Sequence, residues 1–178
     1  MILIEIKQQG KTPRALRKAS TQARRDAFRA VGEHWHEKFR PVHFTHRGAR
    51  KYGYKPRQGQ RTAGEPPTTT SSRRRFASSY TGRKLRKWGH TRPLVYSGES
   101  EALTRFLDVR ATSKGSRVVM RAPTLNLRSS PSAPNMREEL TRITPDERSE
   151  LIDVLNSAFT ERMKAARDAH TTTHGGSA

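Results

Sequence analysis

The residues best suited to chemistry are cations in the middle of the chain. Between residues 73 and 87, seven of fifteen side chains are positively charged: Arg73, Arg74, Arg75, Arg83, Lys84, Arg86 and Lys87. Three aromatic residues are interleaved with them, namely Phe76, Tyr80 and Trp88. Cations neutralise phosphates and release counterions, and aromatic rings stack on exposed bases. The pattern indicates contact with a nucleic acid; the alternative is a solvated segment that meets acidic protein surfaces.

A second group of the same residue types precedes this cluster. Its cations are Arg47, Arg50, Lys51, Lys55 and Arg57, and its aromatic residues are Tyr52 and Tyr54. We expect all twelve cations to contact nucleic acid or a partner, with the five aromatic residues as anchors. Nothing in the sequence resembles a zinc finger, an RNA-recognition motif or a basic zipper, so we expect no base-specific recognition.

Other chemistries find little support. The chain has no cysteine, which excludes disulfides, thiolate nucleophiles and iron–sulfur clusters. His34 and His36 are close in sequence, but residues two apart on a helix face different directions, and no acid joins His43 and His46. We therefore expect no metal and no cofactor.

Enzymatic motifs are also missing. The acidic residues Asp108, Glu138 and Glu139 show no recognisable acid–base spacing, Ser97-Gly98 lacks the flanking glycine of a nucleophile elbow, and there is no phosphate-binding glycine loop. A non-enzymatic protein is expected, and a nuclease is the least favoured alternative.

The positive charge is concentrated in one third of the chain. The 178 residues carry a net charge of +20, of which residues 1–39 contribute +5, residues 40–92 contribute +14, and residues 93–178 contribute +1. A segment this cationic repels itself, and 40–72 lacks hydrophobic periodicity. We therefore expect residues 40–92 to form an extended basic arm or loop, ordered only against a polyanion or an acidic surface.

The elements around this segment follow from local patterns. Alternation over Ile2–Ile6 predicts a strand, and apolar residues at i, i+4 predict a long helix over Pro13–Phe39, capped by Thr12 and ended by Pro41. Residues 73–88 could form a short helix that Gly82 weakens.

The second half predicts a sheet and a closing helix. We expect a hairpin of Thr104–Ala111 and Arg117–Ala122 with Gly115 at positive φ, then a loop over 123–135 and a strand over Met136–Ile143. Thr144-Pro145-Asp146-Glu147 is a capping box that begins a helix running to about residue 167.

These elements define the fold class as α+β: a small antiparallel sheet packed by a long N-terminal helix and a C-terminal helix. We expect one domain over residues 1–169, with the basic arm at about 40–92, and a disordered tail over 170–178. No apolar run approaches the ~20 residues that cross a bilayer, and the N-terminus does not resemble a signal peptide. We expect no membrane association and synthesis in the cytoplasm.

The order of features resembles the neck and tail-completion proteins of tailed bacteriophages. The resemblance rests first on the N-terminal strand and helix and on the basic insertion, which holds Lys51-Tyr52-Gly53-Tyr54 and Arg83-Lys84-Leu85-Arg86-Lys87. It rests also on the turn Arg92-Pro93-Leu94-Val95-Tyr96-Ser97-Gly98 and on Glu138-Glu139-Leu140-Thr141 before the final helix. The usual leucine soon after the turn glycine is displaced to Leu103.

The resemblance implies a virion protein assembled in the host cytoplasm. Such a protein is a structural subunit of a homo-oligomeric ring at the head–tail junction, binding portal or adaptor proteins on one side and tail proteins on the other, with non-specific contact to double-stranded DNA. The alternative that the composition supports is a free basic nucleic-acid-binding protein, such as a ribosome-associated or DNA-packaging factor.

Overall fold

The computed structural model describes residues 14–63, 65, 69–95, 97–120 and 135–174. Its elements, in chain order, are α1 (Arg14–His34), a π-helical turn η1 (Trp35–Phe39), a 3-10 helix η2 (Arg40–Phe44), α2 (His46–Lys51), α3 (Thr70–Ser78), α4 (Tyr80–Trp88), α5 (Glu99–Leu103), β1 (Asp108–Thr112), β2 (Gly115–Val119), α6 (Met136–Leu140) and α7 (Pro145–His174). The described elements confirm the predicted α+β class, with a two-stranded antiparallel sheet and two long helices.

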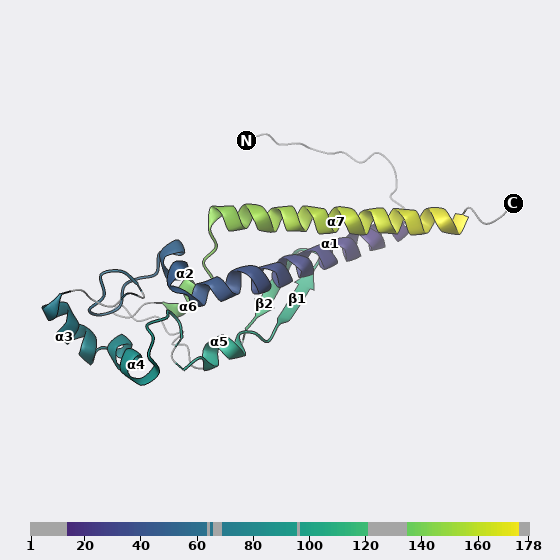
Figure 1. Ribbon diagram of the computed structural model, residues 1–178. Helices are drawn as coiled ribbons and strands as arrows, with labels where there is room; N and C mark the ends of the chain where they lie inside the picture. Colours follow the sequence, from purple (N-terminus) through teal and green to yellow (C-terminus); the bar gives the residue numbers. More distant parts are fainter. Residues whose placement is uncertain (1–13, 64, 66–68, 96, 121–134, 175–178) are drawn as a thin grey trace.

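The two long helices lie side by side and run in opposite directions (Figure 1). His34 near the end of α1 lies 2.5 Å from Glu150 near the start of α7, and Arg162 further along α7 lies 3.9 Å from Asp26. The predicted i, i+4 stripe of α1 supplies the contact, because its alanines allow close approach, and Ala27 is fully buried. We call α1 and α7 the helical pair.

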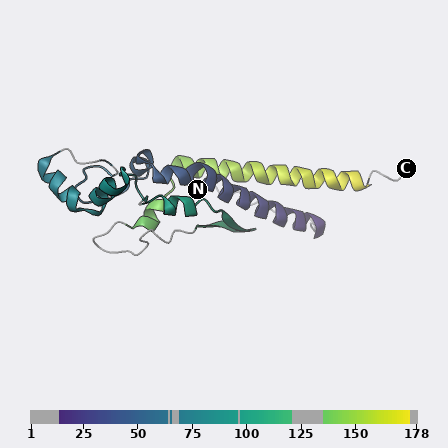
Figure 2. The ribbon, with the colours of Figure 1, turned by 60° about the horizontal axis from the view of Figure 1, so that its bottom comes forward.

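The hairpin packs against α1 on the side away from α7 (Figures 1 and 2). Gly32 permits this contact, because a Cβ at that position would lie 2.8 Å from the Cγ1 of Val109. The hairpin was predicted, but its pairing runs from Asp108 with Val119 to Thr112 with Gly115, a shorter ladder than expected.

The predicted positive φ of Gly115 is wrong. Gly115 does not adopt a positive φ, and the turn is built by the side chain of Thr112 instead. Its hydroxyl accepts a hydrogen bond from the Lys114 amide at 3.2 Å and donates one to the Gly115 carbonyl at 3.1 Å. A threonine side chain can replace a glycine in this way because it imitates a backbone partner.

Pro41 does not end the first helix as predicted. The α-helical pattern stops at His34, and the chain continues through η1 into η2, where Pro41 occupies the first turn and its missing N–H costs no hydrogen bond. The change of helical pitch places Trp35, Phe39 and Phe44 in the interior.

The expectation of an extended arm over residues 40–92 is wrong. This segment contains most of a buried cluster whose members come from both sides of the basic region: Phe44, Ala49, Tyr52, Tyr54, Ala63, Leu94, Val95 and Leu140. We call residues 40–95 together with α6 the lobe. It folds because a few aromatic side chains supply the apolar surface that the low content of large aliphatic residues does not.

Long-range ion pairs join residues 40–92 to the C-terminal third of the chain. Glu139 of α6 accepts two hydrogen bonds from the guanidinium of Arg57, at 3.0 and 2.7 Å. Glu147 of α7 accepts hydrogen bonds from the Tyr52 hydroxyl at 2.6 Å and the Lys51 ammonium at 2.5 Å. Both glutamates are buried, so acids from outside the segment neutralise part of its charge.

Glu147 also completes the predicted capping box, which the structure confirms. Its carboxylate accepts a hydrogen bond from the Thr144 amide at 3.0 Å, and the Thr144 hydroxyl accepts one from the Glu147 amide at 3.4 Å. The helix that follows is longer than expected, because α7 continues to His174 and includes the first residues of the predicted tail.

Two further predictions need correction. The strand expected over Met136–Ile143 is wrong, since Met136–Leu140 forms α6, whose first turn Asn135 caps by accepting a hydrogen bond from the Glu138 amide. The single helix expected over 73–88 is two helices that meet at Ser79. The predicted strand Ile2–Ile6, the cap Thr12, Pro13, most of the loop 123–135 and residues 175–178 lie outside the described residues.

Candidate nucleic-acid interface

Helices α3 and α4 form a helical hairpin at the end of the lobe farthest from the helical pair (Figures 1 and 2). We call this hairpin the basic tip. Thr69 caps α3 by accepting a hydrogen bond from the Ser72 amide, and Ser79 caps α4 by accepting one from the Gly82 amide. Gly82 allows the helices to touch, because a Cβ there would lie only 2.0 Å from the Phe76 carbonyl oxygen.

The basic tip is cationic and has no acidic side chain. No aspartate or glutamate occurs between residues 69 and 88. Six of its seven cations are exposed: Arg73, Arg74, Arg75, Arg83, Arg86 and Lys87. Guanidinium and ammonium groups without acids among them suit contact with a phosphate backbone.

The other predicted cations have different surroundings. Lys84 is buried, and Arg57 is largely buried against Glu139, so neither is available to an external polyanion. Arg50 pairs with Glu65, and Lys51 pairs with Glu147. Arg47 and Lys55 are exposed on the lobe, but they lie outside the basic tip.

Three of the five predicted aromatic anchors are structural instead. Tyr52, Tyr54 and Phe76 are at most 5% exposed, so they cannot stack on bases or reach a partner. Tyr80 and Trp88 are 47% and 41% exposed at the basic tip, and the Lys87 ammonium lies 5.1 Å from the Trp88 ring centroid. Sequence alone could not separate these groups, because stacking anchors and core residues use the same side chains.

Electrostatics confirm the structural role of the buried aromatic groups. Burial lowers the pKa of His43 to about 4, so the ring is neutral at pH 7, and it stacks on Tyr52 with ring centroids 3.8 Å apart. Burial also raises the pKa of both Tyr52 and Tyr54, with the Glu147 and Glu139 carboxylates adding to the effect. Burial opposes ionisation of Glu147, but hydrogen bonds from Lys51 and Tyr52 outweigh it and lower its pKa.

A second cationic surface lies on α1. Five of its basic side chains are exposed: Arg17, Lys18, Arg24, Arg25 and Arg29. The signal was present in the sequence as cations spaced four and seven residues apart, which places them on neighbouring stripes of a helix.

The described residues contain no group of three or more histidine, aspartate or glutamate side chains placed to hold a metal ion. Within the same residues, none of the helices combines the length and apolar character that crossing a membrane requires. Comparison of the chain with protein-family models, with curated proteins and with solved structures finds no match. Its function must therefore be inferred from its own residues.

Proposed function

We propose that this chain is a non-enzymatic structural subunit of a phage head–tail junction, in which copies form a ring around the DNA channel. The observation that carries the proposal is the basic tip, which groups six exposed cations without an acid at one end of an elongated molecule. DNA must slide through such a channel, so diffuse phosphate contact without base readout is the suitable kind of interaction.

Exposed apolar side chains supply surfaces for protein partners. Phe106 is 69% exposed and Leu107 beside it 42%, while Ile143 and Ile152 near the start of α7 are 46% and 49% exposed. Large apolar side chains in contact with water favour association with another protein surface. In a closed ring each copy would offer the same surfaces, with portal or adaptor proteins on one side and tail proteins on the other.

The sequence resemblance to neck and tail-completion proteins favours this assignment over the alternative. That alternative, a free nucleic-acid-binding protein such as a ribosome-associated or DNA-packaging factor, uses the same basic tip directly on a phosphate backbone. The two proposals differ in partners, because only the structural subunit requires a fixed position in a virion.

Quantitative mass spectrometry of purified phage particles tests the proposal. A structural subunit occurs at a fixed copy number relative to the portal protein, and the number does not change when particles are washed in high salt. A variant with Phe106→Ser is expected to fold and to be absent from particles, whereas Arg47→Gln serves as a matched surface control that is incorporated. Loss of the chain from washed particles, together with tight binding of the purified monomer to RNA or DNA, would establish the alternative.

A further inference from the structure

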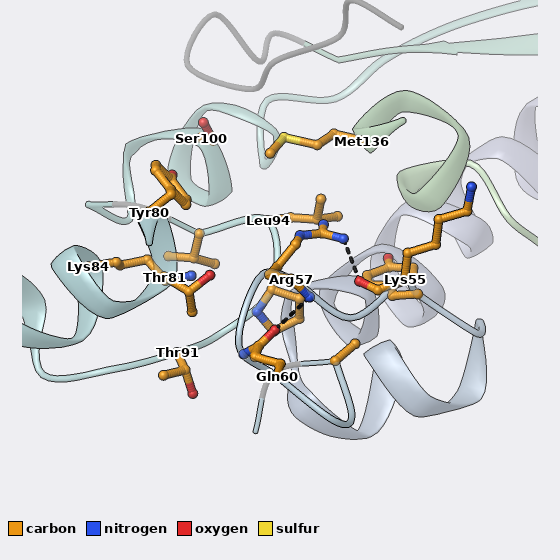
Figure 3. A pocket seen from close by; sticks show the side chains of 14 residues that line it. Lys55, Arg57, Gln60, Tyr80, Thr81, Lys84, Thr91, Leu94, Ser100 and Met136 are labelled. Carbon is orange, nitrogen blue, oxygen red and sulfur yellow. Dashed lines mark hydrogen bonds between the residues drawn. The ribbon is translucent and has the colours of Figure 1, made fainter. Parts of the chain in front are cut away.

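A small cavity lies inside the lobe, behind the basic tip (Figure 3). Its volume is about 40 Å³, and its walls come from α4, from the loop after α2, from residues 91–95 and from α6. A space of this size holds up to about three water molecules. Most of its lining is apolar, and Lys84 and Gln60 are polar residues that line it from different elements.

Lys84 is a buried cation without an acidic partner. The residue is 4% exposed, and its ammonium donates one hydrogen bond, at 2.5 Å, to the carbonyl of Arg92. No carboxylate in the part of the chain that the structure describes forms an ion pair with it. The Tyr80 ring centroid lies 6.0 Å from the ammonium, but a ring face does not replace an anionic partner, and a buried charge is costly unless it is paired.

Gln60 presents an unpaired donor to the same cavity. Its side-chain carbonyl oxygen accepts a hydrogen bond from the Arg57 amide at 3.0 Å, and this contact fixes the orientation of the side-chain amide. The amide nitrogen, Nε2, is therefore held inside the protein, where it is buried and has no hydrogen-bond partner. An unsatisfied buried donor of this kind indicates an acceptor that occupies the space.

We propose that this cavity binds one oxyanion of phosphate chemistry between the Lys84 ammonium and the Gln60 amide. The charges around it favour an anion. Arg57 and Arg92 flank the site, but each already pairs with a carboxylate, that of Glu139 and that of Glu101 respectively. Lys84 is thus the positive charge that the flanking pairs leave uncompensated.

The protonation of Lys84 agrees with this site. Burial, and then the positive charges of Arg57 and Arg92, lower the pKa of Lys84 to about 8. The ammonium form still predominates at pH 7, and a bound anion would raise the pKa again. The other titratable side chains that line the cavity are Tyr54, Lys55 and Tyr80.

Titration of the full-length protein with inorganic phosphate tests the site. Calorimetry and thermal unfolding are run at pH 7 against sodium chloride of equal ionic strength, which isolates specific binding from screening. Wild type is expected to bind phosphate and to unfold at a higher temperature with it. Lys84→Met, which keeps the aliphatic stem, is expected to reduce the affinity at least about tenfold, the effect of losing a charged hydrogen bond. Lys87→Met, on the exposed face of the same helix, is the control and should bind as wild type does.

Gln60→Met removes the unpaired amide nitrogen together with the oxygen that accepts from the Arg57 amide, and it keeps the test decisive if Lys84→Met does not fold. It is expected to weaken phosphate binding severalfold while Arg57 keeps its ion pair. No binding beyond the chloride control, or equal binding by wild type and both cavity variants, overturns the proposal.

A second arm identifies the source of the phosphate group. Because Lys84 is only 4% exposed, a DNA duplex is not expected to reach the cavity, and its phosphates should contact the exposed cations of the basic tip instead. If phosphate and a short duplex bind independently, and Lys84→Met weakens the binding of phosphate alone, the ligand is free phosphate. Displacement of the cavity phosphate by the duplex would overturn an enclosed site, and neither outcome depends on the proposed role in a virion.

Discussion

The lobe and the helical pair are stabilised by different means. In the lobe, His43 lies parallel to Tyr52, with a 4° angle between the rings, and two carboxylates that accept hydrogen bonds from residues 40–92, Glu139 of α6 and Glu147 at the start of α7, are at most 3% exposed. Between the helices of the helical pair, small apolar residues such as Ala27 pack closely, and the contact of Glu150 with His34 is partly exposed to solvent. The lobe adds buried polar groups to its aromatic core, whereas the helical pair depends on an apolar stripe.

This difference explains how a chain with only 31% hydrophobic residues can fold a strongly basic segment. Each buried glutamate accepts hydrogen bonds from several donors, so its charge is compensated within the interior. Removing one member of such a network is costly, because its partners are then left buried and unpaired. The lobe should therefore be sensitive to single substitutions that the helical pair tolerates.

The largest effect is expected from Glu147→Ala. The substitution leaves Lys51 and Tyr52 without their shared acceptor and removes the cap of α7, so we expect the free energy of unfolding to fall by about 3–5 kcal/mol. Urea denaturation followed by circular dichroism measures it. Glu150→Ala, which breaks the exposed ion pairs of the helical pair, is the matched control and should cost much less. Equal losses in the two variants would remove the distinction between the regions.

Gly82→Ala should have the next largest effect. The added methyl group meets the Phe76 carbonyl and separates α3 from α4, and overpacking of this kind costs about 1–3 kcal/mol. Limited proteolysis should then cut between the two helices of the basic tip. Gly115→Ala is the control, because nothing lies within 4 Å of that position and its φ is not positive. Its stability should match that of wild type.

Stability should fall on mild acidification because of His43. The pKa of His43 is about 4 in the folded protein and near 6.5 when unfolded, so below pH 6.5 the unfolded state binds more protons and gains relative stability. Between pH 7 and pH 5 we expect a loss of about 2 kcal/mol from this group. Denaturation at both pH values measures it.

His43→Phe, which keeps the stacked ring, should remove most of that pH dependence. His90, whose pKa is also lowered by burial, acts in the same direction, and His90→Gln identifies its share. A slope as steep in His43→Phe as in wild type would show that another group is responsible.

The smallest effect on folding is expected from neutralising the basic tip. Changing Arg73, Arg74 and Arg75 to Gln should alter stability little, because all three are exposed. If each contacts a phosphate, the slope of log K against log salt for duplex DNA falls by about 2.7. The same three-residue change at Arg17, Arg24 and Arg25 compares the α1 surface. A larger reduction there would move the DNA interface from the basic tip to the helical pair.

Local interactions made part of the fold predictable. The capping box of Thr144 and Glu147 lies within four consecutive residues, and the i, i+4 stripe of the helical pair is a property of one helix face. The hairpin followed from two β-prone runs and a turn. Each of these depends on neighbours in the sequence, so composition and spacing suffice to find them.

The proposed oxyanion cavity and the exposure of each cation could not be predicted from local sequence patterns. Lys84 and Lys87 belong to the same basic run, yet one is buried and the other is exposed. The difference arises because one side of α4 packs against the rest of the lobe, and contacts with other elements, including residues 54–63 and α6, determine which side is buried.

By itself, the sequence determined the α+β class, the long helices, the capping box and the net charge that limits the kinds of partner. Tertiary structure decided whether residues 40–92 are an arm or a lobe. Its decisive contacts join residues far apart, such as Arg57 with Glu139 at a separation of 82 positions and Tyr52 with Glu147 at 95. A run of cations that repel one another folds into a lobe only when carboxylates distant in the sequence pair with it. No local sequence pattern shows which distant residues will form these pairs.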